Sequence, residues 1–219
     1  MKDKSALMQK TAIRFAKVGP SIYHSHHDMI RFWERAVKRA NLPMRLTQGF
    51  NPRPRMVFPH ALGVGIASRH EEVELELHAA VPLDDLLRRI TDACGDTLDI
   101  LEAVNLPPVK KSRQMTASFY RICGWPASAN ETLGGIGDLI LGRGEIVVER
   151  GAPGDKRRVD IRPHIKSVAY DAAAGCIELE LSHSQSGSAR PDEIAKLAAA
   201  EAGVDWRDLT MEKTGMCLS

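Results

Sequence analysis

Extended segments and amphipathic helices alternate along the chain in an order that constrains its fold more than any single motif does. In the first half the order is strand, helix, strand, strand, helix, strand, because segments with period-two alternation are separated by segments with helical spacing of apolar residues. The expected strands are residues 11–17, 44–47, 72–78 and 98–104, with a further extended run at 56–58, and the expected helices are residues 26–40 and 82–94. This is the order of a ferredoxin-like (βαββαβ) unit.

The second half follows the same order less regularly. Its expected strands are 117–123, 145–149, 176–181 and 209–217, its expected helices are 130–141 and 191–202, and residues 159–170 are expected to form an extended arm. A stretch rich in proline and charge, residues 106–116, predicts a linker between the halves. We therefore expect an α+β protein with two ferredoxin-like modules in tandem, residues 1–105 and 117–219, of which the second is less regular.

Composition and cysteine spacing exclude several classes of protein. No stretch approaches the roughly 18 uninterrupted apolar residues of a transmembrane helix, and the N-terminus lacks the apolar core of a secretory signal. The four cysteines stand far apart without a CxxC pair, so they indicate neither an iron–sulfur cluster nor a zinc ribbon, and we expect no cofactor and no metal. Cysteines spaced in this way are typical of buried small side chains in a reducing compartment, so we expect a cytoplasmic protein without membrane contact.

The net charge of +2 conceals a strong gradient along the chain. Residues 1–60 hold 12 lysines and arginines against 3 acidic residues, whereas residues 61–110 hold 4 against 10. Residues 111–170 are basic again, and residues 171–219 are acidic. An N-terminal excess of this size indicates a concentrated basic surface, which favours a polyanionic partner.

The basic residues of the first half gather on one helix face and in one loop. Four cations lie opposite the apolar stripe of the helix at 26–40, and two prolines and a glycine stiffen a loop at 48–55 that carries two arginines. Arginine binds phosphate through paired N–H donors, and an exposed aromatic ring stacks on unpaired bases. The candidate nucleic-acid-binding residues are Arg31, Arg35, Lys38, Arg39, Phe50, Asn51, Arg53 and Arg55. The alternatives are a solvated helix face with Phe50 in the core, and a protein-docking surface.

A group of histidines precedes the same helix. His24, His26 and His27 lie beside Ser25 and Asp28, whose spacing is that of a capping box. The N-terminus of a helix favours anions and lowers the pKa of a histidine. His26 is therefore the candidate for ligand contact or general acid–base catalysis, while capping, packing or a metal site are the alternatives for the group.

Three glutamates alternate with apolar residues in the clearest of the expected strands. Glu72, Glu74 and Glu76 therefore share one face of that strand. Acidic residues are rarely buried, so we expect this face to be solvated.

The first half resembles a known bacterial family. The likeness is carried by Arg14, Phe15, Lys17, Gly19, Ser25, His26, Asp28, Arg31, residues 35–40, Leu42, Pro43, residues 48–55, Leu62, Gly63, Ser68 and residues 72–77. In this order they resemble the radical SAM-linked protein family, in which a leucine usually replaces His27 and a histidine replaces Arg53. That family is named for its link to a radical SAM enzyme, whose cysteine motif this chain lacks. The resemblance therefore implies a partner of such an enzyme.

These features together predict an RNA-binding accessory protein. We expect it to bind tRNA or rRNA and to serve as the substrate-binding or docking partner of an RNA-modifying or RNA-processing enzyme, of the radical SAM class if the resemblance holds. One alternative is a metal-independent RNA endonuclease with His26 as acid or base. Another is a protein-only adaptor.

Overall fold

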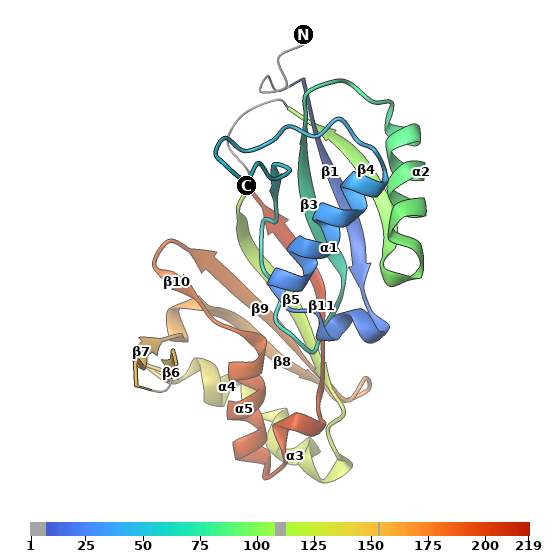
Figure 1. The fold of residues 1–219 in the computed structure, drawn as a ribbon. Helices are drawn as coiled ribbons and strands as arrows, with labels where there is room; N and C mark the ends of the chain where they lie inside the picture. The colour runs from blue at the N-terminus through green and yellow to red at the C-terminus, as the bar shows by residue number, and fades with distance from the viewer. Residues whose placement is uncertain (1–7, 108–112, 153) are drawn as a thin grey trace. The chain divides into compact units, whose positions relative to one another are not determined.

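The computed structural model describes residues 8–107, 113–152 and 154–219, and the chain divides into two compact units, Met1–Gln114 and Met115–Ser219 (Figure 1). The expected α+β class is confirmed, since the described ranges contain five α-helices together with antiparallel strand pairs. None of these helices has the length and apolar character that crossing a membrane requires. The predicted linker at 106–116 falls partly on residues 108–112, which lie outside the described residues.

The first unit is a small antiparallel sheet with two helices. Its central strand β1 pairs with β4 on one side and with β3 on the other, and β3 also pairs with the short β2. The helices α1 and α2 lie on one face of this sheet, and their apolar side chains form the core with those of β1 and β3 (Figure 1). In chain order the elements are β1 Gln9–Lys17, α1 His26–Arg39, β2 Met56–Val57, β3 Ile66–Leu77, α2 Leu83–Cys94 and β4 Asp99–Leu106.

Helix α1 begins and ends as the sequence predicts. The capping box is confirmed, because the Asp28 backbone N–H donates to Ser25 Oγ at 3.2 Å and the Ser25 N–H donates to Asp28 Oδ2 at 3.1 Å. Trp33 is completely buried and packs on Phe15 of β1, with ring centroids 5.2 Å apart. Because this stripe is fixed against the sheet, the basic residues on the opposite side of the helix remain exposed.

The expectation of a solvated acidic face on β3 was wrong. Glu72, Glu74 and Glu76 are each less than 9% exposed. The carboxylate of Glu74 lies 2.7 Å from Lys10 Nζ and 2.9 Å from Arg113 Nε, which also brings its guanidinium to Glu72. Burial of a carboxylate is tolerated only when a cation or several donors pair with it, and basic side chains from a neighbouring strand and from loops meet this need.

The second unit is built around β5. This strand pairs antiparallel with β11 on one side and with β9 on the other, and the far edge of β9 pairs with β8 and then with β10. Strands β6 and β7 form a separate hairpin, and α3, α4 and α5 contact the sheet (Figure 1). The elements are β5 Met115–Cys123, α3 Asn130–Gly134, α4 Ile136–Leu141, β6 Val147–Arg150, β7 Arg157–Asp160, β8 Ile165–Asp171, β9 Cys176–Ser184, β10 Gly187–Ser188, α5 Pro191–Ala202 and β11 Thr210–Leu218.

Three predicted elements differ in the structure. Residues 44–47 form no regular strand, and only isolated bridges join Met44 to Leu77 and Leu46 to Pro54, because prolines in the following loop lack the N–H groups that a strand pair needs. The helix expected at 130–141 is divided into two at Gly135. The extended arm expected at 159–170 is interrupted by a short 3-10 turn.

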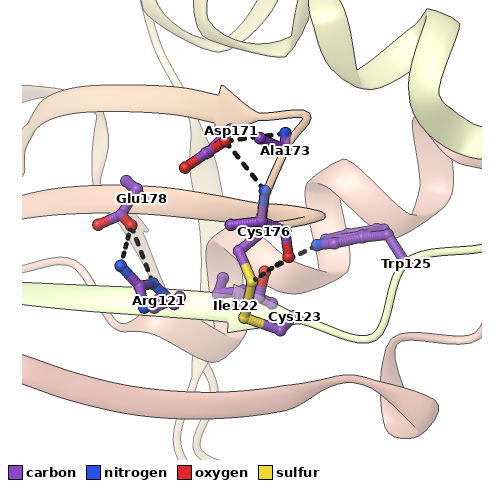
Figure 2. The surroundings of a disulfide bond; sticks show 9 residues. Arg121, Ile122, Cys123, Trp125, Asp171, Ala173, Cys176 and Glu178 are labelled. Carbon is purple, nitrogen blue, oxygen red and sulfur yellow. Dashed lines mark hydrogen bonds and ion pairs between the residues drawn. A yellow bond between two sulfur atoms is a disulfide. The ribbon is translucent and has the colours of Figure 1, made fainter.

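The prediction that all four cysteines are buried thiols was wrong, since two of them form a disulfide and Cys217 is exposed. Cys123 and Cys176 form a disulfide between β5 and β9, where the two residues are direct partners in the strand register and their Cα atoms are 4.3 Å apart (Figure 2). Cys94 remains a buried thiol, and burial raises its pKa to about 12. Disulfides are uncommon in reducing compartments, so the cytoplasmic location stays a prediction.

Candidate nucleic-acid interface

A groove of about 680 Å³ lies between α1 and the loop that follows it. Leu42, Met44 and Leu46 contribute apolar surface to its lining, together with Pro52 and Pro54. Its polar lining residues are Glu34, Arg35, Lys38, Asn41, Arg53 and His78. Apolar surface with a few convergent polar groups is typical of ligand-binding sites.

The loop that forms one wall of the groove is closed by its own hydrogen bonds. The backbone N–H of Thr47 donates to the Arg53 carbonyl at 2.8 Å, and the Arg53 N–H donates to Thr47 Oγ1 at 2.9 Å. At the tip, Gly49 has a φ of +132°, a conformation that side chains with a Cβ rarely adopt. The two hydrogen bonds between Thr47 and Arg53 are consistent with the prediction of a stiffened loop at residues 48–55.

Phe50 stands at the tip of this loop and is fully exposed, with a relative exposure of 106%. It is therefore not a core residue, which was the alternative interpretation of its sequence position. Asn51 beside it is exposed as well. A large aromatic side chain without intramolecular cover is available to stack on a ligand.

Three of the predicted cations come together in the groove. Arg35 and Lys38 occupy neighbouring positions on the exposed side of α1, and within the described ranges neither side chain forms a hydrogen bond or an ion pair. Arg53 enters from the loop, is 71% exposed, and lies 3.7 Å from Glu34 (Nη1 to Oε1). The groove therefore carries positive charge that ion pairs among the described residues neutralise only in part.

The other predicted cations lie elsewhere. Arg55 Nε lies 3.0 Å from Glu76 Oε2, an oxygen that Arg45 also approaches at 2.7 Å. Arg39 lines a separate depression with Arg89. Arg31 is exposed on the preceding turn of α1 and influences Asp28 electrostatically. These three positions stay predictions as phosphate contacts, but they do not line the groove.

His26 lies in a second site at the start of α1. A cavity of about 10 Å³ is lined by His26, Lys17, His60 and Glu71 among others, and His26 contacts Phe58 edge to face at a centroid distance of 5.5 Å. Burial lowers the pKa of His26, with a smaller contribution from the neighbouring His27. His26 is therefore held toward its neutral form, which accepts a proton.

Sequence reasoning missed the residues that line this cavity with His26. Lys17 of β1 lines this cavity together with Phe15, and it is only 2% exposed. Burial lowers the pKa of its ammonium, and the charge of Glu71 partly opposes this. Period-two alternation does not locate Lys17, because the pairing of β1 with β3 shifts register between Phe15 and Lys17 and Ala16 between them is buried as well.

Histidine spacing at this helix raised a metal site as an alternative. Over the parts of the chain that the structure describes, no three His, Cys, Asp or Glu residues are grouped as metal ligands are. The rings of His26 and His27 are 6.3 Å apart and tilted by 51°.

Comparison with known proteins places the chain in a family. A family model described as "Uncharacterized protein conserved in bacteria (DUF2344)" matches residues 10–191, which include both the groove and the His26 cavity. The chain belongs to the DUF2344 family. No curated protein matches it. The description of the DUF2344 family mentions no radical SAM enzyme, so that link stays a prediction.

Proposed function

We propose that this DUF2344 protein binds RNA and serves as the substrate-binding or docking partner of an RNA-modifying or RNA-processing enzyme. One observation carries the proposal: a fully exposed aromatic ring, Phe50, stands at the tip of the loop that walls a groove with three cations. Phosphates bind lysine and arginine and release counterions, while bases stack on aromatic rings. A solvated helix face explains the cations but gives no reason for the exposed Phe50.

We also make a proposal about the fold of the two units. We infer that the units are two ferredoxin-like modules in tandem, because the first has the strand order β4-β1-β3-β2 and the second has β11-β5-β9-β8. In each unit the first strand is central and pairs with the third and the last of its module. The β6–β7 hairpin and the split helix then account for the less regular second module.

Filter binding of total tRNA and rRNA fragments across a salt series tests RNA binding. We expect binding at low salt and an affinity that falls steeply as salt rises. Arg35→Ala combined with Arg53→Ala should lower the affinity about tenfold and reduce the slope against the logarithm of salt by about 1.5. Arg69→Ala combined with Arg157→Ala is the matched control, because it removes the same charge from exposed positions outside the groove that form no ion pair within the described ranges. Absence of binding at low salt, or equal losses in both double variants, contradicts the proposal.

The partner enzyme requires its own experiment. Tagged protein is purified from its native cells with and without nuclease treatment, and the co-purifying proteins are identified. An RNA-modifying or RNA-processing enzyme, of the radical SAM class if the resemblance extends to partners, is the expected companion. Co-purification that survives nuclease treatment while RNA binding is absent supports the protein-only adaptor instead.

A second function is favoured by the His26 cavity. In an RNA endonuclease, neutral His26 would take the proton of a ribose 2′-hydroxyl as its oxygen bonds to phosphorus, and the 5′-oxygen would leave with a proton from a second acid. The buried Lys17 would stabilise the charge on the phosphoryl oxygens. The products are a 2′,3′-cyclic phosphate and a 5′-hydroxyl. The cavity has the volume of about one water molecule, so its rim must open, which makes this the second candidate.

Incubation of structured RNAs with wild type, His26→Ala and His27→Ala distinguishes the two functions. His27 is exposed and adjacent, so it controls for any general effect of losing a histidine. Cleavage that vanishes only in His26→Ala supports the endonuclease. RNA that stays intact while bound supports the accessory protein.

A further inference from the structure

An acidic residue lies among the cations of the groove. Glu34 of α1 lines it together with Arg35, Lys38 and Arg53, and its side chain is 25% exposed. The distance of 3.7 Å from Arg53 Nη1 to Glu34 Oε1 is too long for a hydrogen bond. The carboxylate is thus attracted by Arg53 without being saturated by it.

Phosphate binding alone does not account for Glu34. A carboxylate repels a phosphate and lowers the attraction that the groove offers to an RNA backbone. Lys38 follows Glu34 by four residues, the favourable arrangement for an ion pair on a helix, yet no such pair forms between them within the described ranges. Both oxygens of Glu34 therefore retain acceptor capacity at a site that otherwise suits anions.

The chemistry of the bases shows what such an acceptor recognises. Guanine presents two adjacent donors, N1–H and the N2 amino group, which match the two oxygens of one carboxylate. Adenine and cytosine each offer one exocyclic amino group at this edge, and uracil offers only its N3–H. Leu42, Leu46 and Pro54 provide apolar surface in the same groove for the faces of a base.

We propose that the groove takes an unpaired guanine of single-stranded RNA and that Glu34 binds its Watson–Crick edge. This inference rests on the proposed RNA binding and names the substrate class of the same site. In a duplex the Watson–Crick edge is already paired, so only loops, bulges and single strands present it. Arg35, Lys38 and Arg53 then bind the flanking phosphates, and Phe50 stacks on a neighbouring base.

The test compares short RNAs that differ by one base. Fluorescence anisotropy measures the affinity of the full chain for an oligouridylate with one central guanosine, and for the same oligonucleotide with inosine, adenosine or uridine there. Inosine lacks only the N2 amino group, and we expect it to bind about tenfold more weakly than guanosine. Pairing the guanosine with a complementary strand should abolish the preference.

Substitution of Glu34 identifies the group responsible. In Glu34→Gln the preference for guanosine over inosine should fall to less than about twofold, while the affinity for oligouridylate stays equal or rises because a negative charge is lost. Glu34→Asp keeps the charge near Arg53 but shortens the side chain, and it should reduce the guanosine preference too. Glu102→Gln, at an exposed position on β4, is the control. Thermal unfolding confirms that each variant is folded.

Each outcome decides between the inference and the proposed function. Equal binding of guanosine and inosine by wild type overturns the inference but leaves RNA binding intact. A uniform loss for all four RNAs in Glu34→Gln shows that Glu34 only positions Arg53, and it also overturns the inference. If wild type binds neither these four RNAs nor tRNA and rRNA fragments, both the guanine inference and the proposed RNA-binding function are overturned.

Discussion

Two sets of basic side chains in the first unit differ in what they face. On β3, the carboxylates of Glu74 and Glu76 are buried and paired with cations, among them Lys10 and Arg55. In the groove, Arg35 and Lys38 have no such partner within the described ranges, and Arg53 has only a distant one. The basic excess of residues 1–60 is therefore divided between charges that hold the fold and charges that remain available to a ligand.

The difference shows why a charge count is a poor guide to a binding surface. A buried ion pair contributes little beyond an apolar pair, but removal of one partner leaves an uncompensated charge, which is strongly destabilising. An exposed cation contributes little to stability. Substitutions in the available set should thus affect ligand binding, whereas substitutions in the paired set should affect stability.

The largest expected effect is on the buried pair. Glu74→Gln keeps the size of the side chain but removes the buried carboxylate that lies 2.7 Å from Lys10 Nζ, on a lysine that is 2% exposed. We expect a loss of about 3–5 kcal/mol in the free energy of unfolding, measured in urea. Arg35→Ala should change it by less than about 0.5 kcal/mol. Similar losses in both variants contradict the division.

The exposed ring of Phe50 should contribute to RNA binding but not to the stability of the fold. Phe50→Ala is expected to weaken single-stranded RNA binding by about 1–3 kcal/mol, because it removes a stacking surface. Since the side chain is fully exposed, the free energy of unfolding should stay within about 0.5 kcal/mol of wild type. Phe50→Tyr keeps the ring and serves as the control. Unchanged RNA affinity in Phe50→Ala shows that the ring has another role.

Arg55 offers a sharper test, because the sequence placed it with the groove residues and the structure places it beside Glu76. Arg53→Ala should weaken RNA binding about fivefold, whereas Arg55→Ala should change it less than about twofold. Arg55→Ala should lower the free energy of unfolding more than Arg53→Ala does, because Arg55 pairs with the buried Glu76. Filter binding and urea unfolding of the two variants, measured side by side, check both statements.

A change of pH should alter the stability of the fold through His183 but should have the smallest effect on RNA binding. Burial, and then the charges of Lys213 and His164, lower the pKa of His183 to about 4. The unfolded chain binds this proton near the ordinary histidine pKa of about 6.5, so the contribution of His183 to stability is complete above that pH and is lost as pH falls toward 4. His183→Gln should flatten this part of the stability curve. RNA affinity between pH 7 and 8 should not change, because arginine and lysine keep their charge there.

Local sequence patterns predicted much of the fold. The apolar stripe and the capping box located α1 almost to the residue, and proline at its start located α5, Pro191–Ala202. These signals depend on residues three or four positions apart, which a sequence shows directly. The cations of the groove were predicted for the same reason, since Arg35 and Lys38 share one helix face.

Features that depend on pairing across the chain could not be predicted. The disulfide needs Cys123 and Cys176 to meet in the register of β5 and β9, 53 positions apart in the sequence. The pairing of Arg55 with Glu76 and the burial of Glu71 beside Lys17 also depend on how strands and loops align. No local pattern encodes these distances.

The most direct test of the central claim is to map the RNA on the protein. Short-wavelength ultraviolet cross-linking of single-stranded RNA to the full chain, followed by trypsin and mass spectrometry, identifies the peptide that contacts a base. We predict a cross-link in residues 46–55, which contain Phe50, and its loss in Arg35→Ala combined with Arg53→Ala. Cross-links that avoid this peptide and persist in the double variant would contradict the claim that the groove is the RNA-binding site.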